Sequence, residues 1–150
     1  MLGQENDLFQ KKSAIFRSGR KNRIGRYGEN LAIKYLLKHN YYIWKRNWAI
    51  RSGELDIIAI QEHTLVFVEV KTRLKEVAEN FNPFDAVDDK KIKHIQRVSE
   101  SFLEKYQAQL RYRRVNKVRF DIIGVIVTSK LNDFWLKKED IIHYQNAFQV

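Results

Sequence analysis

Cysteine is absent from this 150-residue chain, and proline occurs once, at Pro83. Without cysteine the chain forms neither disulfides nor thiolate metal sites, which suits a reducing compartment such as the cytoplasm. No apolar run approaches the roughly 20 residues of a membrane-spanning helix, and the N-terminus lacks the apolar core of a secretory signal. These absences predict a cytoplasmic protein with no membrane partner.

Two common catalytic signatures are missing as well. The sequence has no glycine-rich phosphate loop and no Gly-x-Ser-x-Gly elbow, so nucleotide binding and nucleophilic-serine chemistry have little support. Four histidines are present, at positions 39, 63, 94 and 143, and no two of them fall at metal-ligand spacing. We therefore expect each histidine to be structural or exposed.

Acidic residues are scarce relative to basic ones, at 18 against 28, which leaves a formal net charge of +10. Such a surplus favours polyanionic partners, nucleic acid first and an acidic membrane surface second. The length predicts one domain with a substantial core. Residues 1–23 are polar and basic, and they predict a flexible arm, a phosphate-contacting tail or a short docked helix. Residues 24–150 then form the domain.

The most informative stretch is a predicted β-hairpin over residues 51–73. Its halves, residues 51–60 and 65–73, are rich in β-branched and aromatic residues and meet at a polar turn at Glu62 and His63. Glu-His is not a favoured two-residue hairpin turn, and a slip of one residue would change which side chains share a face. The register of the hairpin therefore decides what its charged residues do.

With that turn, Asp56 falls opposite Glu69, and Glu54 falls opposite Lys71 on the same face. Opposed residues have Cβ atoms about 4.5–5.5 Å apart, so the two carboxylates repel each other. A shared proton, a cationic side chain or a metal ion relieves such repulsion. Two hard oxygen donors suit Mg²⁺ or Mn²⁺, and Lys71 lies close enough to act on whatever the metal holds.

A plainer interpretation is a partly exposed hairpin whose charges face water, with a Glu54–Lys71 surface pair. The composition of the charged face argues against it, because that face is not simply polar. It also carries Ile58, Ile60, Leu65 and Phe67. The Asp…Glu-x-Lys arrangement, moreover, is what a metal-dependent phosphodiesterase requires.

The remaining elements predicted by residue spacing and composition are two helices and two strands, over residues 25–40, 84–106, 41–48 and 117–128. The apolar run at 122–127 predicts a central, buried strand. The tail, residues 134–148, adds a short strand or helix at the sheet edge. Glu29 lies near the start of the first helix, where the helix dipole alone favours an acid. Alternatively, Glu29 leans over the hairpin as a third metal-binding carboxylate.

Several basic side chains are candidates for contact with nucleic acid. In the helix predicted over residues 84–106, basic residues and His94 recur on one face. That face is either exposed to solvent or a stripe that contacts DNA. The densest cluster runs from Arg111 to Arg119 without an acid. The aromatic residues of 41–48 are expected to pack in the core and at its edge, not to stack on bases. The candidates are Arg46, Arg51, Arg73, Lys90, Lys93, Arg97, Arg111, Arg113 and Arg114.

In this order, the helix with Glu29, the strand and the hairpin resemble the YraN-like family. Its members are small, mostly bacterial proteins with the restriction-endonuclease-like fold of the PD-(D/E)XK nucleases. The hairpin motifs are GELDIIA at 53–59 and FVEVKTR at 67–73. Other matching stretches are GRYGE at 25–29, RNW at 46–48, AV at 86–87 followed by KK at 90–91, RFD at 119–121 and NAF at 146–148. The resemblance covers about residues 25–148.

The resemblance implies an α/β fold in which helices flank a mixed central β-sheet, with the element order α-β-β-β-α-β. The same layout is similar to archaeal Holliday-junction resolvases. By that similarity Glu29, Asp56 and Glu69 are metal ligands, and Lys71 positions or activates the attacking water. Asp56 follows Leu55 where the superfamily's name has proline, a departure that is common among resolvase-like members.

These inferences predict an Mg²⁺- or Mn²⁺-dependent DNA endonuclease, with branched or otherwise structured DNA as a candidate substrate. A homodimer is a further expectation, because resolvases dimerise to cut two strands symmetrically. Two other classes stay open. One is a nucleic-acid-binding protein of the same fold without turnover. The other is an interaction or scaffolding protein, whose binding would hardly change with salt.

Overall fold

The computed structural model describes residues 22–130 and 135–149, together with Gly19. Within these residues a five-stranded mixed sheet has the strand order β1-β2-β3-β4-β5. The strands are β1 (Tyr42–Ile50), β2 (Gly53–Gln61), β3 (Thr64–Leu74), β4 (Lys117–Lys130) and β5 (Trp135–Phe148). Strands β3 and β4 run parallel, whereas the other neighbouring pairs run antiparallel. The predicted mixed α/β architecture is therefore confirmed.

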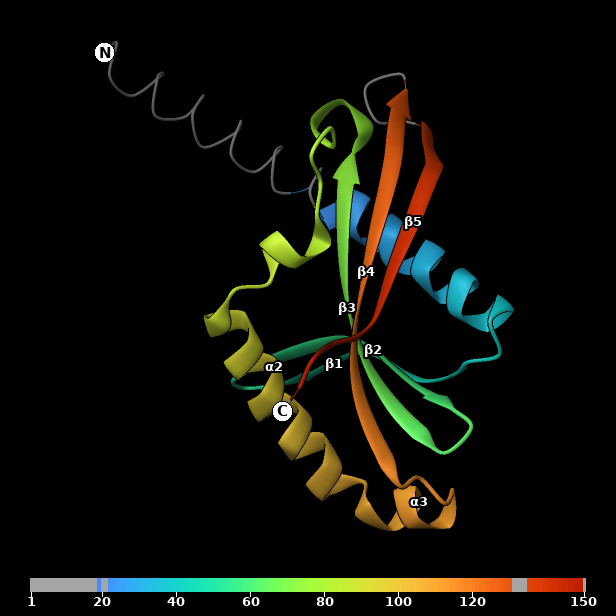
Figure 1. Ribbon diagram of the computed structural model, residues 1–150, viewed down its shortest axis with the longest axis vertical. Coiled ribbons are helices and arrows are strands. Elements are labelled where there is room, and N and C mark those ends of the chain that lie inside the picture. Colours follow the sequence, from blue (N-terminus) through green and yellow to red (C-terminus); the bar gives the residue numbers. More distant parts are fainter. Residues whose placement is uncertain (1–18, 20–21, 131–134, 150) are drawn as a thin grey trace, which may run out of the picture.

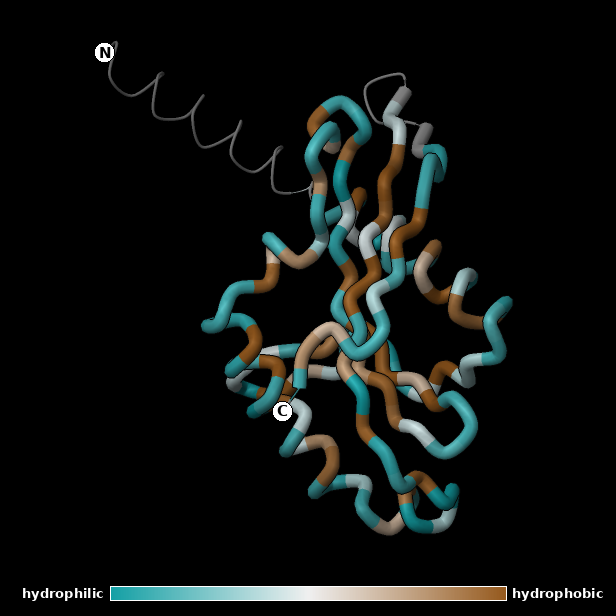
Figure 2. The backbone as a smooth tube through the Cα atoms, viewed as in Figure 1, coloured by the Kyte–Doolittle hydropathy of each residue, from teal (hydrophilic) through white to brown (hydrophobic). Residues whose placement is uncertain are grey.

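Two long helices cover opposite faces of this sheet (Figure 1). The first helix, residues 22–38, packs with Leu36 and Ala32 on a cluster that contains Val66 and Val68. Helix α2 (Asp89–Lys105) covers the other face, where its apolar side chains meet a second cluster around Phe67. The apolar stretches of β3 and β4 in Figure 2 lie between these two layers. The expectation of a buried β4 is confirmed, because Ile122 and Ile123 are fully buried.

The segment between β3 and β4 differs from the single helix predicted over residues 84–106. It begins with two 3-10 turns, η1 (Lys75–Val77) and η2 (Pro83–Ala86). Helix α2 begins only at Asp89, because the carboxylate of Asp88 accepts a hydrogen bond from the backbone N–H of Lys91 at 2.7 Å and caps it. A short helix that the sequence did not predict, α3 (Gln107–Tyr112), follows.

The two ends of the chain are described in part. The predicted arm lies mostly outside the described residues, at 1–18 and 20–21, while the first helix already includes residues 22 and 23. The tail, left open as a strand or a helix, is strand β5, and it pairs with β4. None of the helices in the described part of the chain is long and apolar enough to cross a membrane.

The hairpin forms with the predicted register, and Gln61 pairs with Thr64. Glu62 adopts a φ of 54°, a positive value that two-residue hairpin turns require at their first position. The β2–β3 ladder ends at the pair Ile57–Val68. Beyond that point β3 stays paired with β4 as far as Leu74, while β2 stays paired with β1. Figure 1 shows the β1–β2 part turning off to one side as β3 continues beside β4.

Gly28 allows the first helix to approach β3 closely, because a Cβ atom there would overlap the side chain of Thr72. We expect Gly28→Ala to destabilise the fold by about 1–3 kcal/mol through overpacking, although alanine is the better helix former by about 1 kcal/mol. Gly25→Ala is the matched control, since nothing lies within 4 Å of its added methyl group. Urea unfolding compares the two variants, and equal stability would contradict the close approach.

Candidate functional site

The predicted acidic residues lie where β2 and β3 separate. Asp56 and Glu69 are each the next residue after the last paired position of the hairpin. Past this point the backbone N–H of Val70 donates to Oδ2 of Asp56 at 2.7 Å. A side-chain carboxylate therefore occupies the acceptor position that a strand carbonyl would otherwise take. The expected cross-strand pair is replaced by a junction at which both acids still lie side by side.

Glu69 is almost fully buried, at 5% exposure, and two lysines neutralise it. Nζ of Lys71 donates to its Oε1 at 2.6 Å, and Nζ of Lys91 lies 3.1 Å from the same oxygen. The suggested Glu54–Lys71 pair is absent among the described ion pairs, because Lys71 turns to Glu69 and Glu54 is exposed. Sequence reasoning missed Lys91. The signal available was the KK pair at 90–91, of which only Lys90 was proposed.

Asp56 carries the clearest electrostatic signature of the site. Burial, the neighbouring charge of Glu69 and the more weakly acting charge of Glu29 together raise the pKa of Asp56 to about 7. The hydrogen bond from Val70 and the charge of Lys91 act in the opposite direction without cancelling this effect. The three predicted carboxylates therefore share one electrostatic environment, although they come from the first helix, β2 and β3.

A cavity of about 570 Å³ opens beside these groups. Its lining combines the start of the first helix with the end of β3, and it includes Glu29, Val70, Lys71 and Arg73. The predicted helix acid, the predicted lysine and a candidate phosphate-binding arginine therefore border the same space. Asp56 and Glu69 do not line this cavity themselves, but Lys71, which contacts Glu69, does, so a ligand there would lie beside the lysine that holds the acidic pair.

The carboxylates of the site are suitable ligands for a hard divalent cation, but their side chains are not arranged around one ion position. Carboxylate oxygens are the ligands that Mg²⁺ and Mn²⁺ prefer. Across residues 22–130 and 135–149, however, no three acidic or histidine side chains converge closely enough to hold a metal ion. Lys71 and Lys91 hold the Glu69 carboxylate instead. A metal at Asp56 and Glu69 would have to displace at least one of these ammonium groups.

The nine basic candidates are all exposed, and they lie on several different elements. Arg73 borders the cavity, where its guanidinium lies 5.4 Å from the ring centre of Phe81. Arg46 on β1 donates to Oδ1 of Asn30 on the first helix at 2.7 Å. The others are Arg51, the α2 residues Lys90, Lys93 and Arg97, and the group Arg111, Arg113 and Arg114 in and after α3.

The proposed basic cluster from Arg111 to Arg119 needs a correction at its far end. The Arg119 guanidinium is half-buried, and it donates to both carboxylate oxygens of Asp121 at 2.9 and 3.0 Å and to the hydroxyl of Tyr41 at 2.7 Å. It is therefore part of a structural network and is not available to a phosphate. His143 belongs to the same network, with Nε2 2.9 Å from Asp121 Oδ2, which confirms the structural role expected of that histidine.

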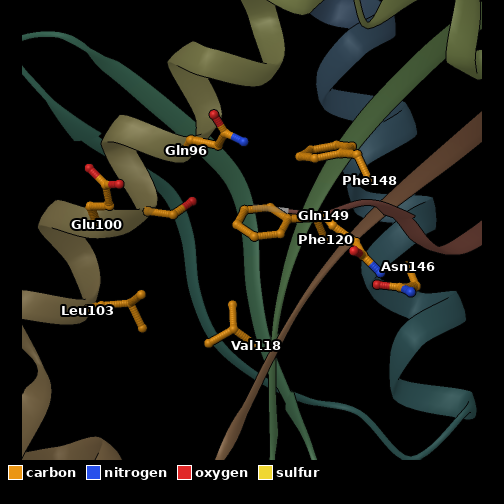
Figure 3. Close-up of a pocket in the computed structure, with 9 residues that line it drawn as sticks. Gln96, Glu100, Leu103, Val118, Phe120, Asn146, Phe148 and Gln149 are labelled. Atoms are coloured by element: carbon orange, nitrogen blue, oxygen red, sulfur yellow. The ribbon is translucent and has the colours of Figure 1, made fainter.

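A second hollow, of about 360 Å³, lies between α2 and the β4–β5 part of the sheet (Figure 3). Leu103, Val118, Phe120 and Phe148 supply apolar lining, and among the described residues that line it Glu100 is the only charged one. This hollow contains none of the predicted site residues. Because its single charge is negative, it is a poor place for a phosphate, and the Asp56–Glu69 junction remains the candidate site.

Comparison with known proteins finds relatives of this chain in one protein family. Residues 28–125 match the uncharacterised protein family UPF0102. A UPF0102 protein of Caldicellulosiruptor bescii is 42% identical over 109 residues, which cover 73% of this chain and 87% of that protein. One from Parabacteroides distasonis is 41% identical over 132 residues, covering 86% and 94% respectively. One from Bacteroides thetaiotaomicron is 43% identical over 105 residues, covering 70% and 80%.

Proposed function

The chain belongs to the uncharacterised protein family UPF0102, and we propose that it is a nuclease that hydrolyses phosphodiester bonds of DNA with a divalent cation. The names of these relatives state no activity, so the proposal depends on the geometry and chemistry of the site. We assign the fold to the restriction-endonuclease-like class, of which the helix, three strands, helix and strand order is typical. The four motif residues Glu29, Asp56, Glu69 and Lys71 are the proposed catalytic set.

The observation that carries the proposal is the pair of adjacent carboxylates, Asp56 and Glu69, beside two lysines and an open cavity. A structural ion pair needs one acid and one base. Here two acids from different strands lie together at a break in the sheet, and a half-buried helix acid, Glu29, adds to their charge. Such clusters of perturbed carboxylates next to a cavity are typical of functional sites.

In this proposal each side chain has a separate task. Asp56 and Glu69 would hold Mg²⁺ or Mn²⁺, with Glu29 as the third carboxylate, and the ion would supply Lewis acidity and lower the pKa of water. Lys71, released from Glu69, positions the attacking water and places positive charge beside the phosphate. Lys91 remains on Glu69 and offsets the negative charge of that buried carboxylate. Arg73, at the edge of the cavity, binds the adjacent backbone phosphate.

The exposed basic side chains fit a long polyanion better than a small phosphate ester. The basic side chains of α2 lie on the same helix as Lys91, which contacts the site. The basic side chains in and after α3 add further positive charge. We propose structured DNA as the substrate and a homodimer as the form that cuts two strands. Affinity should then fall steeply as salt concentration rises, because phosphate contacts release counterions.

Cleavage of end-labelled branched, single-stranded and duplex DNA with Mg²⁺ or Mn²⁺ tests the proposal. We expect the wild type to cut, and Asp56→Asn to lose at least about 100-fold in rate, since the metal supplies several kcal/mol and each 1.36 kcal/mol is tenfold. Glu54→Gln, which removes an exposed acid from the same strand, is the matched control and should cut normally. Equal rates for wild type and Asp56→Asn would exclude this site.

The second candidate function is nucleic-acid binding without turnover. One observation favours it: Lys71 and Lys91 already neutralise Glu69, and no group of three metal-binding side chains is assembled in the described residues. The same experiment separates the two functions. Binding that is tight, salt-sensitive and equal in wild type and Asp56→Asn, without any cutting, would support the binding protein.

A further inference from the structure

Two tyrosines stand out on the basic surface formed by β1 and α3. Tyr42 at the start of β1 is 51% exposed, and Tyr112 at the end of α3 is 90% exposed. Large aromatic side chains usually bury their rings, because the rings carry much apolar surface. The composition of residues 41–48 predicts that their aromatic side chains pack in the core and at its edge. That holds for Trp44 and Trp48, which contact Phe102 edge-on, but not for Tyr42.

The exposed ring of Tyr42 is held on a rigid base. The guanidinium of Arg113 lies 4.8 Å from the ring centre of Tyr42 and 5.4 Å from that of Trp44. Trp44 in turn packs against Tyr106, with ring centres 5.3 Å apart. The arginine is therefore aligned with aromatic rings whose positions the core fixes. Flat groups of this kind, ring and guanidinium alike, are what unpaired bases stack on.

The two chain segments that carry these rings contain basic residues and no acid. From Lys105 to Phe120 the chain has six basic residues and no acid, and β1 has Lys45 and Arg46 and no acid. Arg111, Arg113 and Arg114 are exposed, and Arg114 adopts a left-handed φ of 56° that ends α3. A surface that alternates aromatic rings with uncompensated arginines is complementary to a strand of bases joined by phosphates.

We propose that this surface, which we call the stacking surface and define by Tyr42, Tyr112, Arg111, Arg113 and Arg114, binds single-stranded nucleic acid. The tyrosines and the Arg113 plane stack on unpaired bases, and the remaining arginines contact the phosphates between them. Duplex DNA cannot use the rings, because its bases are stacked on one another. The stacking surface therefore selects strand state, whereas arginines alone would bind duplex and single strands alike.

The place of the stacking surface relative to the acidic site gives it a role that depends on the proposed nuclease function. Lys91, in the first turns of α2, contacts Glu69, and Tyr106, directly after α2, packs beneath the stacking surface. At 1.5 Å per residue these two positions are ~22 Å apart along the helix. Figure 1 shows α3 at the far end of α2. Tyr42 is closer, because it lies opposite Ile60, four strand residues or ~13 Å from Asp56. A single-stranded arm bound to the stacking surface therefore leaves roughly four to seven base pairs of duplex to reach the site.

Binding of fluorescein-labelled oligothymidylate, measured by anisotropy in EDTA, tests the proposal without relying on catalysis. We expect Tyr42→Ala and Tyr112→Ala each to weaken this binding about tenfold or more, with little effect on a duplex of equal length. Tyr42→Phe should retain wild-type affinity, and Tyr42→Leu should not, because leucine keeps apolar bulk without a ring. Leu37→Ala, an exposed apolar residue of the first helix, is the control and should change neither affinity.

The outcomes separate the stacking surface from the nuclease proposal. Unchanged single-strand affinity in both alanine variants would overturn the stacking surface, and so would equal losses for single strand and duplex. Circular dichroism verifies folding, and Tyr112 is so exposed that its replacement leaves the core intact. Loss of single-strand binding supports the surface even if the wild type never cuts DNA. If it cuts, forked DNA should be cleaved roughly four to seven base pairs from the fork.

Discussion

Above pH 7 and without divalent cations, Asp56→Asn should be more stable to unfolding than the wild type, by at most about 4 kcal/mol. Burial and the neighbouring carboxylates raise the pKa of Asp56 from 3.8 to about 7, so the fold disfavours the ionised acid. Each pKa unit corresponds to 1.36 kcal/mol. Asparagine is neutral at every pH, and its side-chain oxygen can still accept the hydrogen bond from Val70.

The pH range of this effect follows from the direction of the shift. The stability associated with protonated Asp56 is fully present below about pH 4, and it is lost as the pH rises through about 7. Urea unfolding of both proteins at pH 5 and pH 8 measures the difference. The gap between the variant and the wild type should widen from pH 5 to pH 8. A gap of equal size at both values would show that Asp56 ionises normally.

Divalent cations should reverse the order of stability. An ion that binds only the folded wild type adds RT ln(1 + [L]/Kd), which is about 2.7 kcal/mol at a concentration 100 times the Kd. Mn²⁺ or Mg²⁺ should therefore raise the midpoint temperature of thermal unfolding for the wild type and for the Glu54→Gln control, but not for Asp56→Asn. Equal stabilisation of all three would place the ion elsewhere. Because the ion needs ionised Asp56, its effect should increase between pH 6 and pH 8.

The hairpin was predictable because its information is local. Alternating side chains and the two-residue turn at Glu62 and His63 determine which residues pair, and the structure has that register up to Ile57 and Val68. The buried run of β4 was predictable for the same reason, because six consecutive apolar residues are typical of a strand that is buried on both faces. Both inferences use neighbours within a few residues in the sequence.

The separation of β2 from β3 was not predictable, because it depends on partners distant in sequence. Strand β3 stays with β4, and β2 stays with β1, so the ladder opens where these two attachments compete. Asp56 then bonds to Val70, a contact that ideal pairing does not contain. Lys91 was missed for a related reason. Its role depends on how α2 packs over the sheet, which helical periodicity alone does not give.

The exposed Tyr42 shows the same limit for surfaces. Its segment, residues 41–48, has the composition of a core strand, and three of its four aromatic residues do pack there. The position of α3 brings Arg113 over the Tyr42 ring. Helical periodicity does not predict α3, because the helix is too short. A surface assembled from two segments 70 residues apart becomes visible only when the chain is folded.

Asp121→Ala should be the most damaging substitution outside the acidic site, with a loss of about 3–5 kcal/mol in unfolding free energy. Asp121 is 1% exposed, and its carboxylate accepts from Arg119, from the backbone of Asn146 and from His143. Alanine leaves these donors unpaired, including the charged Arg119 guanidinium. Urea unfolding measures the loss, and Glu104→Ala on α2, which removes an exposed acid, is the control with little expected change.

The acid dependence of stability separates the charge of Asp121 from its hydrogen bonds. Burial alone would raise the pKa of Asp121, but hydrogen bonds from His143, Arg119 and Asn146 outweigh it and hold the pKa below its usual value. The ionised carboxylate therefore stabilises the fold above about pH 4, and this contribution is lost as the pH falls further. Asp121→Asn should lack that acid-dependent loss. If Asp121→Ala loses DNA cleavage but keeps its stability, Asp121 belongs to the catalytic site and not to a structural network with Arg119 and His143.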